Sequence, residues 1–119
     1  MSRYRLPIVA AATAFALVAA GAAQSATPKL VGTVGPGFTI SLKGASGQSV
    51  KSLNRGVYLI QVADKASIHN FHLSGPSLDK KTSVGGTGTT RWTLRLKPGK
   101  YHFQCDIHPS TMKGDFKVV

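Results

Sequence analysis

The sequence has a single cysteine and very little acidic charge. Its 119 residues include 15 Lys and Arg but only 4 acidic residues, all Asp, with no Glu. One cysteine cannot form a disulfide within the chain, which excludes a disulfide-stabilised scaffold. The length suits one modest domain and excludes an enzyme with a separate cofactor-binding domain. The apolar content of 42%, beside 16% charged residues, excludes a disordered chain.

The first 25 residues are typical of a secretory signal. Arg3 and Arg5 precede an uncharged apolar stretch, Leu6–Ala20, and small residues follow at 21–26. A retained membrane anchor is the alternative, but the stretch is shorter than the roughly 20 residues that span a bilayer. We therefore predict a cleaved signal peptide at residues 1–25. The domain at residues 26–119 would then be periplasmic, envelope-associated or secreted.

The exported domain would be strongly basic. Without Arg3 and Arg5 it keeps 13 basic and 4 acidic residues, a charge of about +9. Such a charge favours anionic partners, namely acidic proteins, lipid headgroups or envelope polymers. Nucleic acid is a poor candidate, because the protein is exported and its basic residues are spread along the sequence instead of clustered.

The exported part is predicted to consist of strands. No helical periodicity is present from Lys29 on, and the 19 Gly and Pro residues favour turns. Alternating or continuous apolar positions predict strands at 38–43, 56–62, 67–73, 91–96, 101–105 and 116–118. Phe38 is expected to face inward in the first of these, and Gly85–Thr90 is expected to be a flexible connection. Short strands at this spacing predict an all-β, two-sheet antiparallel sandwich.

The residues with metal-binding chemistry are near the end of the chain. Cys105, His108 and Met112 lie within eight positions, and His69 is on a predicted strand that can lie beside them. Two imidazoles, one thiolate and a weak thioether suit a copper ion that changes oxidation state. Each residue also has a structural explanation: Cys105 as a small buried apolar group, His69 as a packed histidine, Met112 as a core residue. An unpaired thiol in an oxidising compartment, however, is a liability unless something binds it.

These segments resemble a known family. Gly99–His108 (GKYHFQCDIH), Met112–Gly114 and Phe116–Val118 resemble the C-terminal end of plastocyanins and related cupredoxins, and His69-Asn70 resembles their His-Asn pair. The resemblance implies an eight-stranded Greek-key sandwich with one copper ion in a blue type 1 site. It implies His69, Cys105 and His108 as equatorial ligands and Met112 as axial ligand. It also implies a hydrogen bond from the backbone N–H of Asn70 to the sulfur of Cys105.

The sequence also departs from that family. The gap from His108 to Met112 is one residue shorter than in typical plastocyanins and closer to the azurin spacing. Asp106 places a negative charge beside the thiolate, which would favour copper(II) and lower the potential. A basic surface in place of an acidic docking patch argues against a photosynthetic role. His72 and His102 are expected on the surface, with His72 able to replace His69 only if the strand has a bulge.

Electron transfer is the function that this ligand set favours. The sequence offers no base, nucleophile or open coordination position, so we expect no enzyme activity. Electrons would pass through His108, within a rim formed by Ile107, Pro109 and residues 35–37. We expect a monomer whose redox partner has an acidic surface, with possible association with an anionic membrane or envelope. A copper carrier or buffer and a metal-free binding module are the alternatives.

Overall fold

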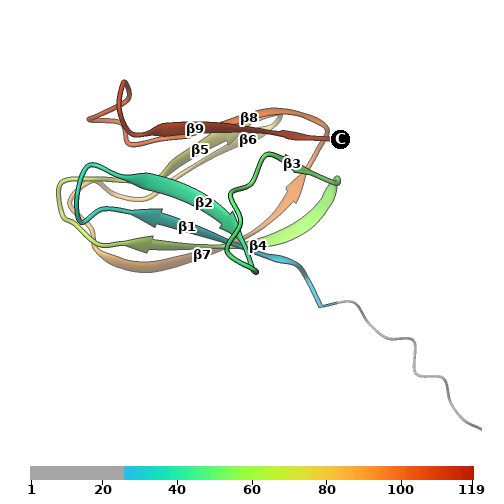
Figure 1. The fold of residues 1–119 in the computed structure, drawn as a ribbon, viewed down its shortest axis with the longest axis horizontal. Helices are drawn as coiled ribbons and strands as arrows, with labels where there is room; N and C mark the ends of the chain where they lie inside the picture. The colour runs from blue at the N-terminus through green and yellow to red at the C-terminus, as the bar shows by residue number, and fades with distance from the viewer. Residues whose placement is uncertain (1–25) are drawn as a thin grey trace, which may run out of the picture.

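The computed structural model describes residues 26–119, so the predicted signal peptide lies outside the described residues. This part of the chain forms nine strands (Figure 1): β1 (Lys29–Val34), β2 (Ile40–Gly44), β3 (Ser52–Leu53), β4 (Gly56–Asp64), β5 (His72–Gly75), β6 (Leu78–Lys81), β7 (Gly88–Leu96), β8 (Gly99–Gln104) and β9 (Lys113–Val118). No helix in the described part could cross a membrane.

The strands form two facing sheets, which confirms the predicted two-sheet sandwich. One sheet has the order β2-β1-β4-β7 and the other the order β3-β9-β8-β5-β6 (Figure 1). The prediction of purely antiparallel pairing is wrong in detail, since β1 pairs with β4 and β3 pairs with β9 in parallel. The chain crosses between the sheets several times, for example between β2 and β3 and between β4 and β5. A strand that follows such a crossing can therefore run parallel to an earlier strand of the same sheet, as β4 does beside β1. The family resemblance implied eight strands, and the two-residue β3 adds a ninth.

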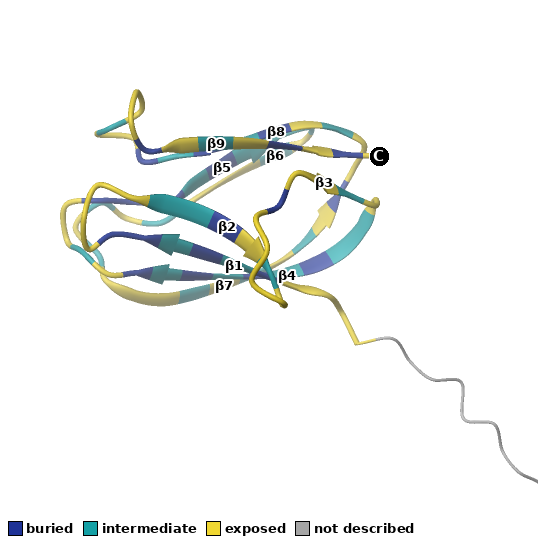
Figure 2. Ribbon diagram, viewed as in Figure 1, coloured by how far each residue is buried: buried dark blue, intermediate teal, exposed yellow. Residues whose placement is uncertain are grey.

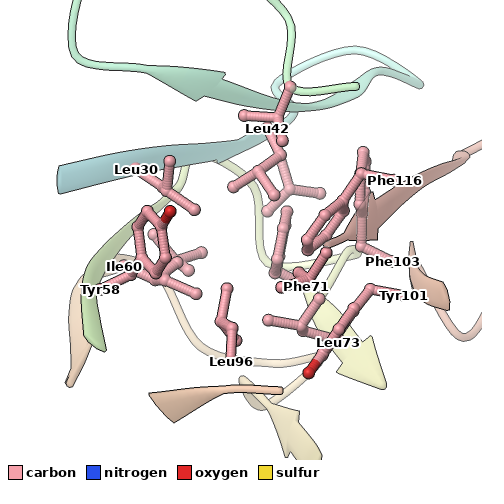
Figure 3. Close-up of a cluster of buried hydrophobic side chains, with 14 of the residues drawn as sticks. Leu30, Leu42, Tyr58, Ile60, Phe71, Leu73, Leu96, Tyr101, Phe103 and Phe116 are labelled. Atoms are coloured by element: carbon pink, nitrogen blue, oxygen red, sulfur yellow. The ribbon is translucent and has the colours of Figure 1, made fainter. Parts of the chain in front are cut away.

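Alternating side chains from both sheets fill the space between them (Figure 3). β4 lies between β1 and β7, and Ile60 and Val62 on its inner face are fully buried. Tyr101, Phe103 and Cys105 face inward as predicted, with exposed fractions of 1%, 6% and 0%. Each large apolar side chain buried in this way contributes about 1.5–3 kcal/mol to folding, and so the two sheets are firmly joined.

Four connections meet at one end of the sandwich, which we call the site end. They are the loops β1–β2, β4–β5, β6–β7 and β8–β9, and the strand registers place them together. The opposite end carries the start of β1 and the end of β9, so that both ends of the described chain emerge there (Figure 1). Burial is greatest along the inner strand faces, and the tips of the connections are exposed (Figure 2).

Two predicted strands begin too early along the sequence, and both errors fall at the site end. β2 begins at Ile40, and Phe38 is 63% exposed instead of buried. The N–H of Gly35 donates to Thr39 O at 2.9 Å, which closes a turn with Phe38 near its tip. β5 begins at His72, because the chain turns at residues 66–69 while it crosses between the sheets. The connection predicted at 85–90 is also shorter, since β7 begins at Gly88.

Candidate metal centre

Two loops at the site end bring three of the predicted ligands together. His69 lies in the β4–β5 connection, and Cys105 and His108 lie in the loop between β8 and β9. One nitrogen of each histidine and the sulfur of Cys105 all lie within 4.8 Å of one another. Residues that are 36 positions apart in the sequence therefore form one cluster.

The spacing of these atoms fits one shared metal ion. Cys105 Sγ lies 3.8 Å from His69 Nδ1 and 3.7 Å from His108 Nδ1. Two ligand atoms that each lie about 2.0–2.3 Å from an ion, at about 120° around it, are separated by about 3.7 Å. One thiolate and two imidazoles are also donors that copper accepts in both of its common oxidation states. The cluster therefore fits copper in both geometry and chemistry.

Backbone hydrogen bonds hold the β8–β9 loop in shape. The N–H of Cys105 donates to Met112 O at 3.0 Å, and the N–H of Met112 donates to His108 O at 2.9 Å. The N–H of His108 in turn donates to Cys105 O at 3.1 Å. These bonds join the backbones of three residues that the sequence predicted as ligands. The loop is thus closed on itself by contacts that do not depend on a metal.

Met112 lies at the end of this loop with its side chain fully buried. It belongs to the same buried cluster as Cys105 and the large core residues. Its burial places the thioether on the inner side of the loop. This position is compatible with a packing role and with a role as axial ligand. Axial ligation by Met112 stays a prediction.

Burial differs sharply among the three clustered ligands. His69 and Cys105 have no exposed surface, whereas His108 is half-buried. Ile107, beside His108, is 53% exposed. Of the three, His108 is thus the ligand whose edge reaches the surface, as the sequence predicted.

Phe38 is a residue of this site that the sequence interpretation missed. Its ring packs edge-to-face on both histidines, with ring centroids 5.3 Å from His69 and 4.9 Å from His108. Edge-to-face contacts of this kind are favourable for aromatic rings. The adjacent turn allows the approach, because Gly35 has φ of 71° and a Cβ there would lie 3.3 Å from His69 Cδ2. The run Gly35-Pro36-Gly37 was the available signal, since a turn there removes Phe38 from the strand.

Asn70 connects the two ligand loops through its side chain. Its Nδ2 donates to Thr82 O at 3.2 Å and to Asp106 Oδ2 at 2.9 Å, and its Oδ1 accepts the N–H of Asp106 at 2.8 Å. Asn70 is 1% exposed and directly follows His69, while Asp106 directly follows Cys105. The side chain therefore sets the positions of both ligands. The hydrogen bond predicted from its backbone to the sulfur of Cys105 stays a prediction.

Asp106 is surrounded by hydrogen-bond donors. Burial alone would raise the pKa of its carboxyl, but donors on Gln104, Asn70 and His72 outweigh burial and lower it to about 2. The negative charge expected beside the thiolate is thus present at neutral pH. His72 contacts this carboxylate, with its Nδ1 2.7 Å from Asp106 Oδ1.

The two remaining histidines lie on the outer face of the second sheet, half-buried and away from the cluster. His72 has Asp106 on one ring nitrogen and Asp79 on the other, and both nitrogens can donate only when the ring is protonated. Burial lowers the pKa of His72, but the hydrogen bonds and charges of Asp79 and Asp106 outweigh burial and raise it. His102 lies 2.8 Å from Asp115 Oδ1 through its Nδ1. Neither histidine replaces His69.

Asp64 is a buried carboxyl beside the cluster. It ends β4, is 6% exposed and accepts the N–H of Ala66 at 3.1 Å. Burial raises its pKa, although the Ala66 hydrogen bond and the nearby His69 act in the opposite direction. Within residues 26–119, its Oδ2 and His69 Nε2 are the buried side-chain atoms without a hydrogen-bond partner. No such bond fixes the buried Nε2 of His69, and packing against Phe38 and His108 helps to orient this ring.

Comparison with known proteins identifies the fold. No family model matches the chain, and no curated protein is detectably similar in sequence. Among solved structures, reduced rusticyanin is 19% identical with a TM-score of 0.56, covering 76% of this chain and 78% of its own. Rusticyanin from Thiobacillus ferrooxidans is 20% identical with a TM-score of 0.52, covering 76% of each chain. A further structure, described as the copper protein rusticyanin, is 18% identical with a TM-score of 0.56 and the same coverage. The chain therefore has the cupredoxin fold that the sequence resemblance implied.

Proposed function

We propose that this protein is an exported carrier of single electrons and not an enzyme. One copper ion would be held in a type 1 site by His69, Cys105 and His108, with Met112 as the axial ligand. The observation that carries the proposal is the cluster of one cysteine and two histidine side chains, two of them fully buried, at the end of a cupredoxin sandwich. The copper named for rusticyanin, which shares this fold, supports the choice of metal.

The protein itself would contribute preorganised ligands, whose positions are fixed before the metal binds. Bound copper would supply a one-electron couple between copper(I) and copper(II). The closed β8–β9 loop and the Asn70 side chain fix Cys105 and His108 relative to His69. Ligands that move little when the charge of the site changes keep the reorganisation barrier low. This arrangement favours electron transfer over chemistry on a bound substrate.

His108 is the proposed point of electron entry and exit. Three of the four large hydrophobic side chains that are exposed in the described part lie at this end, namely Phe38, Ile68 and Ile107. Such a gathering of exposed apolar side chains is typical of an interaction surface. A partner that covers these side chains would bring its own cofactor close to the His108 edge. Export and a partner with an acidic surface remain proposals, supported by the N-terminal sequence and the basic composition.

The visible spectrum after copper addition tests the proposal directly. Copper(II) added to the purified protein should produce an intense blue band from charge transfer between the Cys105 thiolate and copper. Cys105→Ser should abolish the band, and His108→Ala should alter or remove it. His102→Ala is the matched control, because this histidine lies outside the cluster and its loss should leave the band intact.

Two outcomes would overturn the proposal. A colourless complex, or a blue band that survives in Cys105→Ser, would exclude the type 1 site. A blue protein that releases copper(I) to chelators quickly, but exchanges electrons slowly with small redox reagents, would instead indicate a copper carrier. Unchanged thermal stability on copper addition would favour the metal-free binding module, since a ligand that binds the native state raises its stability.

A further inference from the structure

The end of the sandwich opposite the metal centre is strongly basic. Strands β7, β8 and β9 and the segments around β3 all place exposed basic side chains there, and β1 begins nearby. We call this surface the basic end, and it comprises Lys29, Lys51, Arg55, Arg95, Lys97, Lys100 and Lys117.

These charges are not neutralised within the described part of the chain. The ion pairs of residues 26–119 all join a histidine to an aspartate, and none involves a lysine or arginine. Asp64 and Asp106 lie at the site end, and Asp79 and Asp115 are paired with His72 and His102. At the basic end itself, Arg55 donates to Val119 O at 3.4 Å, and the remaining basic side chains face solvent.

Lys100 and Lys117 concentrate positive charge at the basic end. They are direct cross-strand partners in β8 and β9, and like charges in this position repel each other. The N–H of Lys117 donates to Lys51 O at 3.1 Å, which brings a third lysine beside them. The three lysines line a surface hollow of about 430 Å³. Asp115, the acidic residue in its lining, is already paired with His102.

We propose that the basic end binds the phosphate groups of an anionic lipid surface. A lysine-lined hollow beside exposed Lys97 and Arg95 fits anionic headgroups by charge. The position of the chain supports a membrane as the partner: residues 21–28 join the apolar stretch Leu6–Ala20 to β1, which begins near this end. This argument rests on the proposed export, in which the leader would bring the basic end next to the bilayer.

An acidic redox protein fits this surface less well than a membrane does. Lys100 and Cys105 are five residues apart along one extended segment, which corresponds to about 16 Å. A redox partner bound at the basic end would therefore lie far from the ligand cluster. A protein held on a membrane by the basic end would instead present His108, Phe38 and Ile107 away from the lipid. Lipid binding and electron transfer then use opposite ends and do not compete.

Vesicle binding tests this proposal. The full-length sequence is expressed in a host that can export it, the resulting protein is purified, and mass spectrometry determines its N-terminus. Its affinity is measured for vesicles of phosphatidylglycerol and phosphatidylcholine in equal parts, and for vesicles of phosphatidylcholine alone. We expect binding to the anionic vesicles only, weakening as salt rises from about 0.1 M to about 1 M.

Two triple variants with equal loss of charge locate the binding surface. Lys51→Gln, Lys100→Gln and Lys117→Gln together should weaken binding about 10- to 100-fold. Lys65→Gln, Lys80→Gln and Lys81→Gln remove the same charge nearer the site end and should weaken it far less. Thermal unfolding verifies that both variants fold. Binding is also measured for Cys105→Ser, which should be unaffected, so that failure of the electron-transfer proposal does not affect this test.

Several results would overturn the lipid proposal. Equal losses in the two triple variants would mean that net charge alone is responsible. Equal binding to both kinds of vesicle would indicate apolar insertion, and no binding to either would exclude a lipid partner. If soluble polyglutamate binds the basic end more tightly than the anionic vesicles do, the partner is an acidic protein instead.

Discussion

Replacement of Asn70 by alanine should weaken both the fold and the metal centre. The substitution removes three hydrogen bonds from a side chain that is 1% exposed. A neutral hydrogen bond contributes about 0.5–1.5 kcal/mol, and one to a charged group about 1.5–3 kcal/mol. Because Asp106 is exposed and water can replace part of its contacts, we expect a net loss of about 2–4 kcal/mol. For a domain of this size that corresponds to a melting temperature lower by roughly 10–25 °C.

Copper affinity should fall in the same variant. Asn70 joins the loop of His69 to the loop of Cys105, and so its loss allows the two ligands to move relative to each other. Loss of a residue that orients metal ligands typically lowers metal affinity by about 10- to 100-fold. Affinity should be measured by competition with a chelator well below the melting temperature of the variant, so that unfolding does not contribute.

Gln104→Ala is the matched control for Asn70→Ala. Gln104 also donates to Asp106, at 3.0 Å, but from the outer side of the sheet. Its loss should lower the free energy of unfolding by no more than about 1 kcal/mol and leave copper affinity nearly unchanged. If Asn70→Ala lost stability but retained full copper affinity, Asn70 would be a packing residue without influence on the ligands. If neither quantity changed, the proposed connection between the loops would be wrong.

Two further predictions concern His72 and Phe38. The raised pKa of His72 means that its contribution to stability is complete below about pH 6.5 and is lost as pH rises through the folded-state value. Urea unfolding across this range should show the decline in the wild type, and His72→Gln should reduce it; an equal decline in both would refute the assignment. Phe38→Ala should change the free energy of unfolding by less than about 1 kcal/mol, because the ring is 63% exposed. It should still raise the rate of copper loss severalfold, with Phe38→Leu less affected; an unchanged rate would show that the ring does not shield the site.

The local part of the metal centre was predictable from the sequence. Cys105, His108 and Met112 lie within one loop, so their spacing alone keeps them close together, while ligation by Met112 stays a prediction. His69 was predicted from the alternation of His69, Phe71 and Leu73, and all three are fully buried. The predicted strand nevertheless begins five residues too early, because β5 starts at His72. Burial is not confined to that face, since Asn70 between His69 and Phe71 is also buried in the connection that follows the turn at residues 66–69.

Contacts between loops were not predictable in the same way. The alternation of Phe38 with Ile40 and Leu42 indicated a buried strand residue, whereas a turn places Phe38 over two histidines. The hydrogen bonds from Asn70 and His72 to Asp106 depend on which loops meet, and no pattern within either segment contains that information. The same limit applies to the parallel pairing of β1 with β4, which follows from the path of the chain between the sheets.

The positions of the basic residues in the folded protein could not be predicted from the sequence either, and they bear on function. Along the sequence the lysines and arginines are spread out, which argued against a nucleic-acid surface. Strands that reverse direction every few residues return to the same end of the sandwich, so residues as distant in the sequence as Lys29 and Lys117 come to lie toward the same end. Folding thus gathers seven of the thirteen basic residues of the described part at the basic end, whereas the exposed apolar side chains of Phe38, Ile68 and Ile107 lie at the site end. The proposed redox partner must approach His108 closely, and the proposed lipid surface binds the opposite end, so the two partners would not compete for the same surface.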